Sequence, residues 1–188
     1  MSQQELLKKL VEALERAGID YMITGSIASS LQGEPRATHD IDLVVLMDQA
    51  AVPALLAAFP RPEFYLEEAA VRAAIQERGM FNAVEASEGT KIDFWLHTDT
   101  PFDRSRFSRK YAERVFDMEI QVSSPEDTIV AKLQWTKLSG DGEKYFQDAL
   151  RVYEVQAGSL DVGYIERWVE QLSVATLWQR LRDEAEEL

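Results

Sequence analysis

Two carboxylates interrupt the segment of the chain with the strongest strand-forming pattern. Asp40 and Asp42 stand two residues apart at the start of IDLVVL, so both side chains point from one face of the expected strand. Carboxylates at the mouth of an apolar strand repel each other and lose hydration, a cost that a cation between them removes. Because the donors are all oxygens, this pattern favours Mg²⁺ or Mn²⁺.

A third acid, Asp93, stands in the same setting, as one polar residue inside the apolar run of KIDFWL. If the two strands are neighbours, three carboxylates converge on one edge of a sheet. Such a set can hold two metal ions about 3.5–4 Å apart, the arrangement suited to phosphoryl transfer. The alternative interpretation is a surface ion pair between Asp93 and the nearby Lys91.

A turn upstream of the acids has the composition of a phosphate site. Gly25 and Ser26 follow the expected strand 21–24 and open a helix through Leu31. Glycine lets the backbone approach a ligand closely, a helix N-terminus offers free N–H groups, and the Ser26 hydroxyl can donate to a phosphate oxygen. Arg36 is a candidate phosphate or ribose contact. His39 either orients Asp40 or is merely exposed in its loop.

The order of these parts, ITGS, then HDIDLVV, then KIDF, resembles the nucleotidyltransferase fold of the DNA polymerase β superfamily. The segments YMITGSIASSLQGEPRATHDIDLVV, SPEDTIVAKLQW and KYFQDALRV are similar to the abortive-infection nucleotidyltransferase toxins of type IV toxin–antitoxin systems. The resemblance spans roughly residues 19–188.

The resemblance implies a role for each matching position. Gly25 and Ser26 would hold the β- and γ-phosphates of an NTP, and Asp40 and Asp42 would bind both metal ions. Asp93 would bind the catalytic metal and help to deprotonate the acceptor hydroxyl. Two further positions would be Lys132, which would neutralise the triphosphate, and Asp148, a late acidic position that is a base or an acceptor contact. The other interpretation makes Lys132 a solvated helix residue and pairs Asp148 with Lys144.

The implied activity moves a nucleoside monophosphate from an NTP to a hydroxyl and releases pyrophosphate. Three acceptors stay open: an RNA, such as a tRNA end, a protein hydroxyl, or a small molecule of the aminoglycoside kind. The toxin resemblance adds an antitoxin protein as a partner. A non-catalytic nucleotide-binding or toxin–antitoxin interaction protein is the alternative from another functional class.

Several expected elements must position these residues. Apolar spacing predicts a helix from Leu6 to Leu14, strands at 41–46, 81–86, 91–96 and 115–122, and helices at 48–58 and 67–78. Ser124 and Pro125 begin a helix, and Ser139–Gly142 and Gly158–Ser159 break the helices after it. The expected fold class is α/β (α+β), a small mixed sheet flanked by helices. Its α/β domain is 1–123, with a helical C-terminal unit at 124–188 packed on it.

Composition narrows the functional classes. The 188 residues contain no Cys and two His, which argues against disulfides, thiolate metal sites and His-rich zinc sites. No apolar run is long enough for a membrane helix and the N-terminus does not read as a signal peptide, so a cytoplasmic location is expected.

The formal net charge of −13 disfavours general nucleic-acid binding and favours a small or cationic acceptor. One basic stretch, Arg104 to Arg114, interleaves Phe107 and Tyr111 and could contact RNA. The alternative is an amphipathic helix whose aromatic residues face the core.

Overall fold

A computed structural model describes residues 1–35, 37–140 and 142–186. The chain forms two compact units. The first, called the sheet unit below, contains residues 1–24 and 38–122, and the second, the helical unit, contains residues 25–37 and 123–188. Arg36, the candidate phosphate or ribose contact, lies outside the described residues, as does Asp141 within the predicted helix break Ser139–Gly142.

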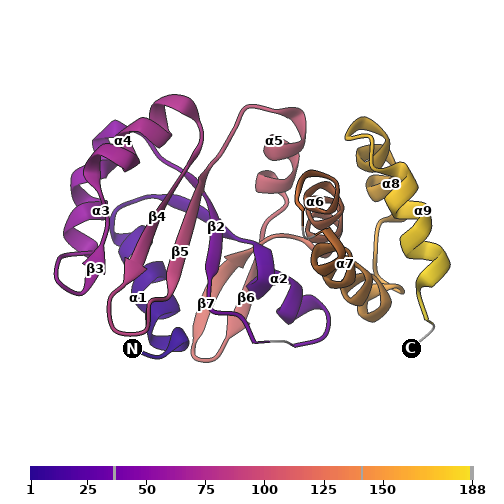
Figure 1. Cartoon of the computed structure of the whole chain (residues 1–188), viewed down its shortest axis with the longest axis horizontal. Coiled ribbons are helices and arrows are strands. Elements are labelled where there is room, and N and C mark those ends of the chain that lie inside the picture. Colours follow the sequence, from indigo (N-terminus) through magenta and orange to yellow (C-terminus); the bar gives the residue numbers. More distant parts are fainter. Residues whose placement is uncertain (36, 141, 187–188) are drawn as a thin grey trace. The chain divides into compact units, whose positions relative to one another are not determined.

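The sheet unit is built on a mixed sheet with the strand order β3-β4-β5-β2-β1-β7-β6 (Figure 1). The pairs β2–β5 and β1–β7 are parallel, and the other neighbours are antiparallel. The strands are β1 (Asp20–Ile23), β2 (Ile41–Leu46), β3 (Phe64–Tyr65), β4 (Met80–Glu85), β5 (Lys91–Leu96), β6 (Tyr111–Val115) and β7 (Met118–Val122).

Side chains on the two central strands, β2 and β5, point alternately to a fully buried face of the sheet and to a face that carries the acids. Ile41, Leu43 and Val45 of β2 are fully buried, as are Ile92 and Phe94 of β5. Side chains on a strand alternate between the two faces, so the residues between these belong to the opposite face. The buried face therefore fixes the register of β2 and β5, because a shift by one residue would place the acids in the core.

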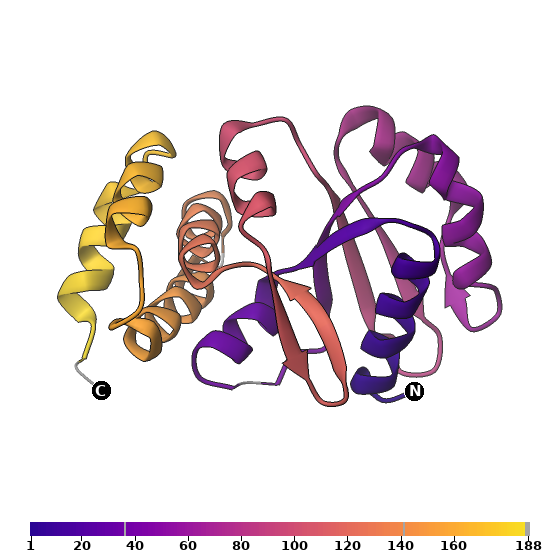
Figure 2. The same ribbon diagram turned by 180° about the vertical axis from the view of Figure 1, so that it is seen from behind.

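Helices surround this sheet within the unit. They are α1 (Gln3–Arg16), α3 (Val52–Ala58) after a short 3₁₀ turn η1 (Gln49–Ala51), α4 (Glu68–Glu77) and α5 (Pro101–Ser108). Figure 1 shows α1 behind the sheet, and Figure 2 shows it in front from the opposite side. A capping box of Ser2 and Glu5 starts α1, and its leucines are buried. On the face that carries the acids, Phe107 of α5 packs against Met22 and Val44, beside Trp95.

Most of the expected strands are confirmed, but the single strand expected at 115–122 is wrong. The chain forms a hairpin, β6–β7, that turns at Phe116 and Asp117, where Phe116 takes a left-handed φ of 55°. Neither residue is a glycine or proline, so Asp117 is the single turn-favouring residue of the pair. The two-residue strand β3 also carried no recognisable pattern.

The helical unit consists of α2 (Gly25–Gln32), α6 (Pro125–Leu138), α7 (Gly142–Gln156), α8 (Val162–Gln171) and α9 (Ala175–Glu184). The predicted start of α6 is confirmed, because Ser124 caps it and Pro125 is its first residue. Helix α2 packs against α6 and α7. Although α2 precedes residue 123, it joins the C-terminal helices by its contacts; the division into functional domains at residue 123 stays a prediction.

Among the described residues, no helix is both long enough and apolar enough to span a membrane.

Candidate active site

The acids of the two central strands lie side by side. Parallel pairing of β2 with β5 places Asp42 directly opposite Asp93, which confirms that the two acid-bearing strands are neighbours. Neighbouring strands are about 4.8 Å apart, and paired residues share a face of the sheet. Asp40 is exposed and directly precedes Ile41, the first residue of β2, and its carboxylate is close enough to raise the pKa of Asp93.

The Asp93 carboxylate has a buried oxygen without a hydrogen-bond donor. Its side chain is 15% exposed, and its Oδ1 atom is buried and accepts no hydrogen bond. The Lys91 ammonium lies beside it, with Nζ 3.7 Å from that oxygen, an ion-pair distance. Burial raises the pKa of Asp93; Lys91 opposes this shift, and the Asp40 carboxylate adds to it. A buried oxygen in this state is a ready acceptor for a proton or a ligand for a cation.

The side chains present fit a hard divalent cation. Within the described part of the chain, no group of three His, Cys, Asp or Glu side chains is close enough to hold a metal ion by itself. Mg²⁺, however, is usually bound by one or two carboxylates together with water and substrate phosphates. The paired Asp42 and Asp93, with the buried Oδ1 of Asp93 that accepts no hydrogen bond, supply that minimal set.

The proposed phosphate turn begins where strand β1 ends. The backbone N–H of Thr24 donates to the Asp42 carbonyl oxygen at 2.9 Å, and Gly25 is the next residue in the chain. Gly25 has a φ of 62°, a left-handed conformation that side chains disfavour, so glycine suits this position for a backbone reason. Helix α2 starts there and includes Ser26. The described geometry thus contains the glycine-initiated helix that the sequence predicted.

Lys132 and Asp148 form a buried ion pair in the helical unit. Lys132 Nζ donates to Asp148 Oδ2 at 2.6 Å, and the two side chains are 4% and 8% exposed. The Lys132 ammonium also lies 5.3 Å from the centre of the Tyr145 ring. The interpretation of Lys132 as a solvated helix residue is therefore wrong. The phosphate and acceptor roles of the two residues stay predictions.

The acid-bearing face holds two polar residues that the sequence analysis did not assign to the site. Asn82 of β4 is paired directly with Asp93, and Lys91 precedes Asp93 by two residues on the same strand face. The sequence suggests Lys91 only as an ion-pair partner of Asp93. The two-residue period of strand β5 could have placed Lys91 on the face of Asp93. To place Asn82 there, the register between β4 and β5 must also be known.

Several side chains of the basic stretch, Arg104 to Arg114, contact other residues of the sheet unit. Phe107 is 8% exposed, and the Lys110 ammonium lies 3.7 Å from the centre of its ring. Lys110 also donates to both carboxylate oxygens of Asp20 at 2.7 Å, and Arg106 pairs with Asp103. Phe107 is therefore buried, as the helix interpretation predicts, but a single helix over the basic stretch is wrong, because α5 ends at Ser108 and Tyr111 begins β6.

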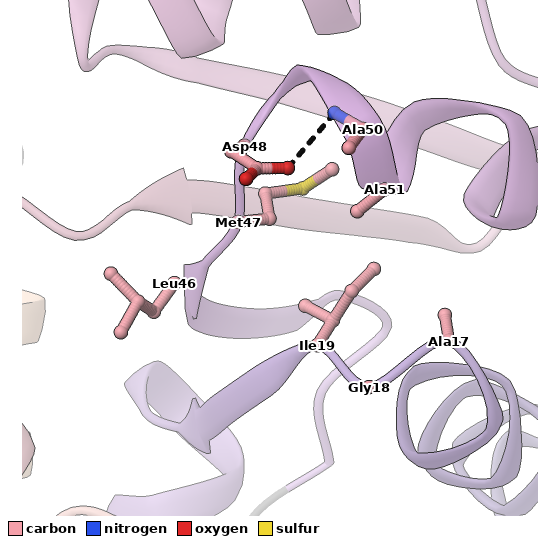
Figure 3. A pocket seen from close by; sticks show the side chains of 8 residues that line it. All are labelled: Ala17, Gly18, Ile19, Leu46, Met47, Asp48, Ala50 and Ala51. Atoms are coloured by element: carbon pink, nitrogen blue, oxygen red, sulfur yellow. Dashed lines mark hydrogen bonds between the residues drawn. The ribbon is translucent and has the colours of Figure 1, made fainter.

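Two surface pockets lie at opposite ends of the central strands. One, of about 260 Å³, is lined in part by Thr38, His39, Glu88 and Thr90, next to the starts of β2 and β5. His39 is exposed and immediately precedes Asp40. The other, of about 500 Å³, lies where β2 ends and β1 begins (Figure 3). Its lining contains none of the candidate site residues.

Comparison with solved structures identifies the fold. The crystal structure of ANT(2'')-Ia in complex with adenylyl-2''-tobramycin matches with a TM-score of 0.60 at 15% sequence identity, covering 96% of this chain and 99% of that chain. A solution structure of the antibiotic-resistance factor ANT(2'')-Ia matches with a TM-score of 0.55 at 14% identity, covering 97% of this chain and 98% of that chain. No sequence among curated proteins matches. The nucleotidyltransferase fold expected from the sequence is thereby confirmed.

The comparison with protein-family models identifies the family. The model of the aminoglycoside-2''-adenylyltransferases matches residues 6–146, which include both central strands and the Gly25 turn. This chain, a nucleotidyltransferase, therefore belongs to the aminoglycoside-2''-adenylyltransferase family.

Proposed function

We propose that this nucleotidyltransferase transfers the adenylyl group of ATP to a hydroxyl of an aminoglycoside or a similar polycationic small molecule. The acceptor oxygen forms a bond to the α-phosphorus, the bond from that phosphorus to the bridging oxygen breaks, and pyrophosphate leaves. The observation that carries the proposal is the in-register pair of Asp42 and Asp93 on parallel strands.

The reaction is proposed to depend on Mg²⁺ or Mn²⁺, with two ions held by Asp42 and Asp93 together with Asp40. When bound, the metal supplies charge neutralisation of the triphosphate and a lower pKa of the attacking hydroxyl. The proton of that hydroxyl is accepted by Asp93, whose buried Oδ1 has no hydrogen-bond donor. In the absence of metal, burial raises the pKa of this carboxyl.

The triphosphate is proposed to be held by the start of α2. The N-terminal N–H groups of a helix attract phosphate oxygens, and the glycine at its first position leaves space for them. The Ser26 hydroxyl would contribute a further donor. Contacts from Arg36 and Lys132 to the nucleotide belong to this proposal and are supported by the family pattern alone.

The aminoglycoside acceptor is favoured over RNA by the family and by charge. Aminoglycosides are polycations, and this chain has a formal net charge of −13. The Phe107 ring that could have stacked on a base is buried instead. No observation supports an RNA acceptor, an antitoxin partner or the toxin branch, and a cytoplasmic location likewise stays a prediction.

Mass spectrometry of the acceptor tests the proposal. The protein would be incubated with ATP, Mg²⁺ and either a panel of aminoglycosides or total RNA, with Asp93→Asn alongside. The expected product is an aminoglycoside carrying one AMP, absent from the variant. An adenylylated RNA would contradict the acceptor. Nucleotide binding without any product would instead support the non-catalytic alternative.

A further inference from the structure

Lys91 stands among the acids that are proposed to bind metal. It is the first residue of β5 and shares a strand face with Asp93, two residues on. Its Nζ atom lies 3.7 Å from Asp93 Oδ1, and its side chain is 46% exposed. The residue therefore places a single positive charge beside the one buried carboxylate oxygen of the pair that accepts no hydrogen bond.

A cation fixed at this position has two opposite electrostatic effects. In the absence of metal it offsets the repulsion between Asp93 and the other acids, in which Asp40 takes part. When a divalent ion approaches the same oxygen, the ammonium repels it, since both cations need the same carboxylate. Because the Lys91 side chain is about half exposed, dissolved ions weaken this repulsion but do not remove it.

We propose that Lys91 is a positioning residue that acts as a tethered counter-ion of Asp93 and weakens the binding of free divalent metal. The negative phosphates of a nucleotide offset its charge, so the site favours metal that arrives together with a nucleotide. This inference rests on the proposed function, because it assumes that Asp42 and Asp93 bind metal.

The test is the affinity for Mn²⁺ alone, measured without nucleotide at about pH 8, where carboxyl groups are ionised. Lys91→Met keeps an unbranched side chain that is one heavy atom shorter and removes its charge. We expect its dissociation constant for Mn²⁺ to be roughly three- to tenfold lower than that of the wild type at low salt. The gain should shrink at high salt, because ions screen the lost repulsion.

Two controls separate charge from structure. Lys91→Arg retains the positive charge and should bind Mn²⁺ like the wild type, and Lys8→Met removes an exposed charge from α1 and should have no effect. Thermal melting checks that each variant is folded. Equal or weaker Mn²⁺ binding by folded Lys91→Met would overturn the inference. If the wild type and Lys91→Met both bind no Mn²⁺, the proposed metal site itself fails, and the inference falls with it.

A second readout is the effect of a non-hydrolysable ATP analogue on Mn²⁺ affinity. The analogue should strengthen Mn²⁺ binding more in the wild type than in Lys91→Met, because only the wild type has a lysine charge for the phosphates to offset. The same enhancement in both proteins would contradict a counter-ion role.

Discussion

The side chains of Lys132 and Asp148 illustrate how burial changes the meaning of a charged residue. Their 2.6 Å contact is almost completely removed from solvent. Removing one partner leaves the other charge buried without its main counter-ion, which is strongly destabilising. The contribution of this ion pair to the free energy of unfolding can therefore be measured separately from any role in catalysis.

We predict that Lys132→Met lowers the free energy of unfolding by about 3–5 kcal/mol, measured by urea denaturation. The double variant Lys132→Met/Asp148→Leu should recover much of this loss, because no unpaired charge remains. Arg16→Ala is the control, since its ion pair with Glu12 is exposed and should contribute less than about 1 kcal/mol. A single variant as stable as the wild type would contradict a structural role for the pair.

The sequence predicts which strands carry the acidic residues better than it predicts which side chains surround them. The spacing of Asp40 and Asp42 predicts that they share one face of a strand. In the structure β2 begins at Ile41, so the strand contains Asp42, and Asp40 directly precedes it. The burial of Lys132 could not be read from the sequence, because α6 is buried around much of its circumference and lacks a clear apolar stripe. Likewise, sequence spacing predicts that Lys91 lies close to Asp93. Placing Asn82 beside Asp93 requires the register between β4 and β5, which the sequence does not show.

At the scale of elements, helix α2 depends on a close approach to α7 within the helical unit. A Cβ atom at Gly33 would lie 2.9 Å from the Val152 backbone nitrogen and 3.0 Å from the Arg151 carbonyl carbon. Both neighbours are backbone atoms of a helix, so they cannot move aside without displacing α7.

We therefore expect Gly33→Ala to lower the free energy of unfolding by about 1–3 kcal/mol, as other overpacked substitutions do. Gly79→Ala is the control, because a Cβ there would meet nothing within 4 Å and its φ is not in the left-handed region. Chemical denaturation of the two variants makes the comparison. Equal stability of Gly33→Ala and the wild type would show that α2 and α7 do not pack as described.

The hairpin between β4 and β5 contains an acid-sensitive element. Glu85 accepts hydrogen bonds from the Ser87 and Glu88 backbone N–H groups and from the Ser87 hydroxyl, at 3.0, 2.9 and 2.8 Å. These bonds lower the pKa of Glu85 from 4.5 to about 2. Since the folded pKa lies below the unfolded value, the carboxylate stabilises the fold above about pH 4.5, and this contribution is lost as the pH falls towards 2.

Glu85→Gln should accordingly be less stable than the wild type at neutral pH, with a difference that narrows as the pH falls from about 4.5 towards 2. Urea denaturation across that range measures the difference. Glu88→Gln, a change at an exposed neighbour, should show no comparable effect. A Glu85→Gln difference that is independent of pH would rule out the hydrogen-bonded carboxylate as its cause.

The elements that the sequence predicts well are those with a strong apolar period. Strands β2 and β5 have the predicted bounds, and α4 is within a residue of its expected ends. The β6–β7 hairpin was missed because its turn uses Phe116 and Asp117 in place of glycine or proline. The membership of α2 in the helical unit depends on contacts with α6 and α7, and these are distant in sequence.

At the scale of the whole molecule, the net charge of −13 bears on the acceptor. An acidic protein attracts a polycation over distances that salt shortens. We predict that the KM for an aminoglycoside rises severalfold between about 0.05 and 0.5 M salt, because screening weakens this attraction. The KM for ATP, an anion, should not rise in parallel. Steady-state kinetics across that range would contradict charge-driven recognition if the aminoglycoside KM were constant or fell.

The most direct test of metal-dependent adenylyl transfer at the paired acids follows the label of ATP. Wild type, Asp42→Asn and the exposed control Asp117→Asn would each receive an aminoglycoside, Mg²⁺ and ATP labelled at either the α- or the γ-phosphate. We predict that only the α label reaches the acceptor, that transfer needs Mg²⁺, and that Asp42→Asn loses at least about 10³-fold in rate while Asp117→Asn does not. Transfer of the γ label, or undiminished α transfer by Asp42→Asn, would contradict the account.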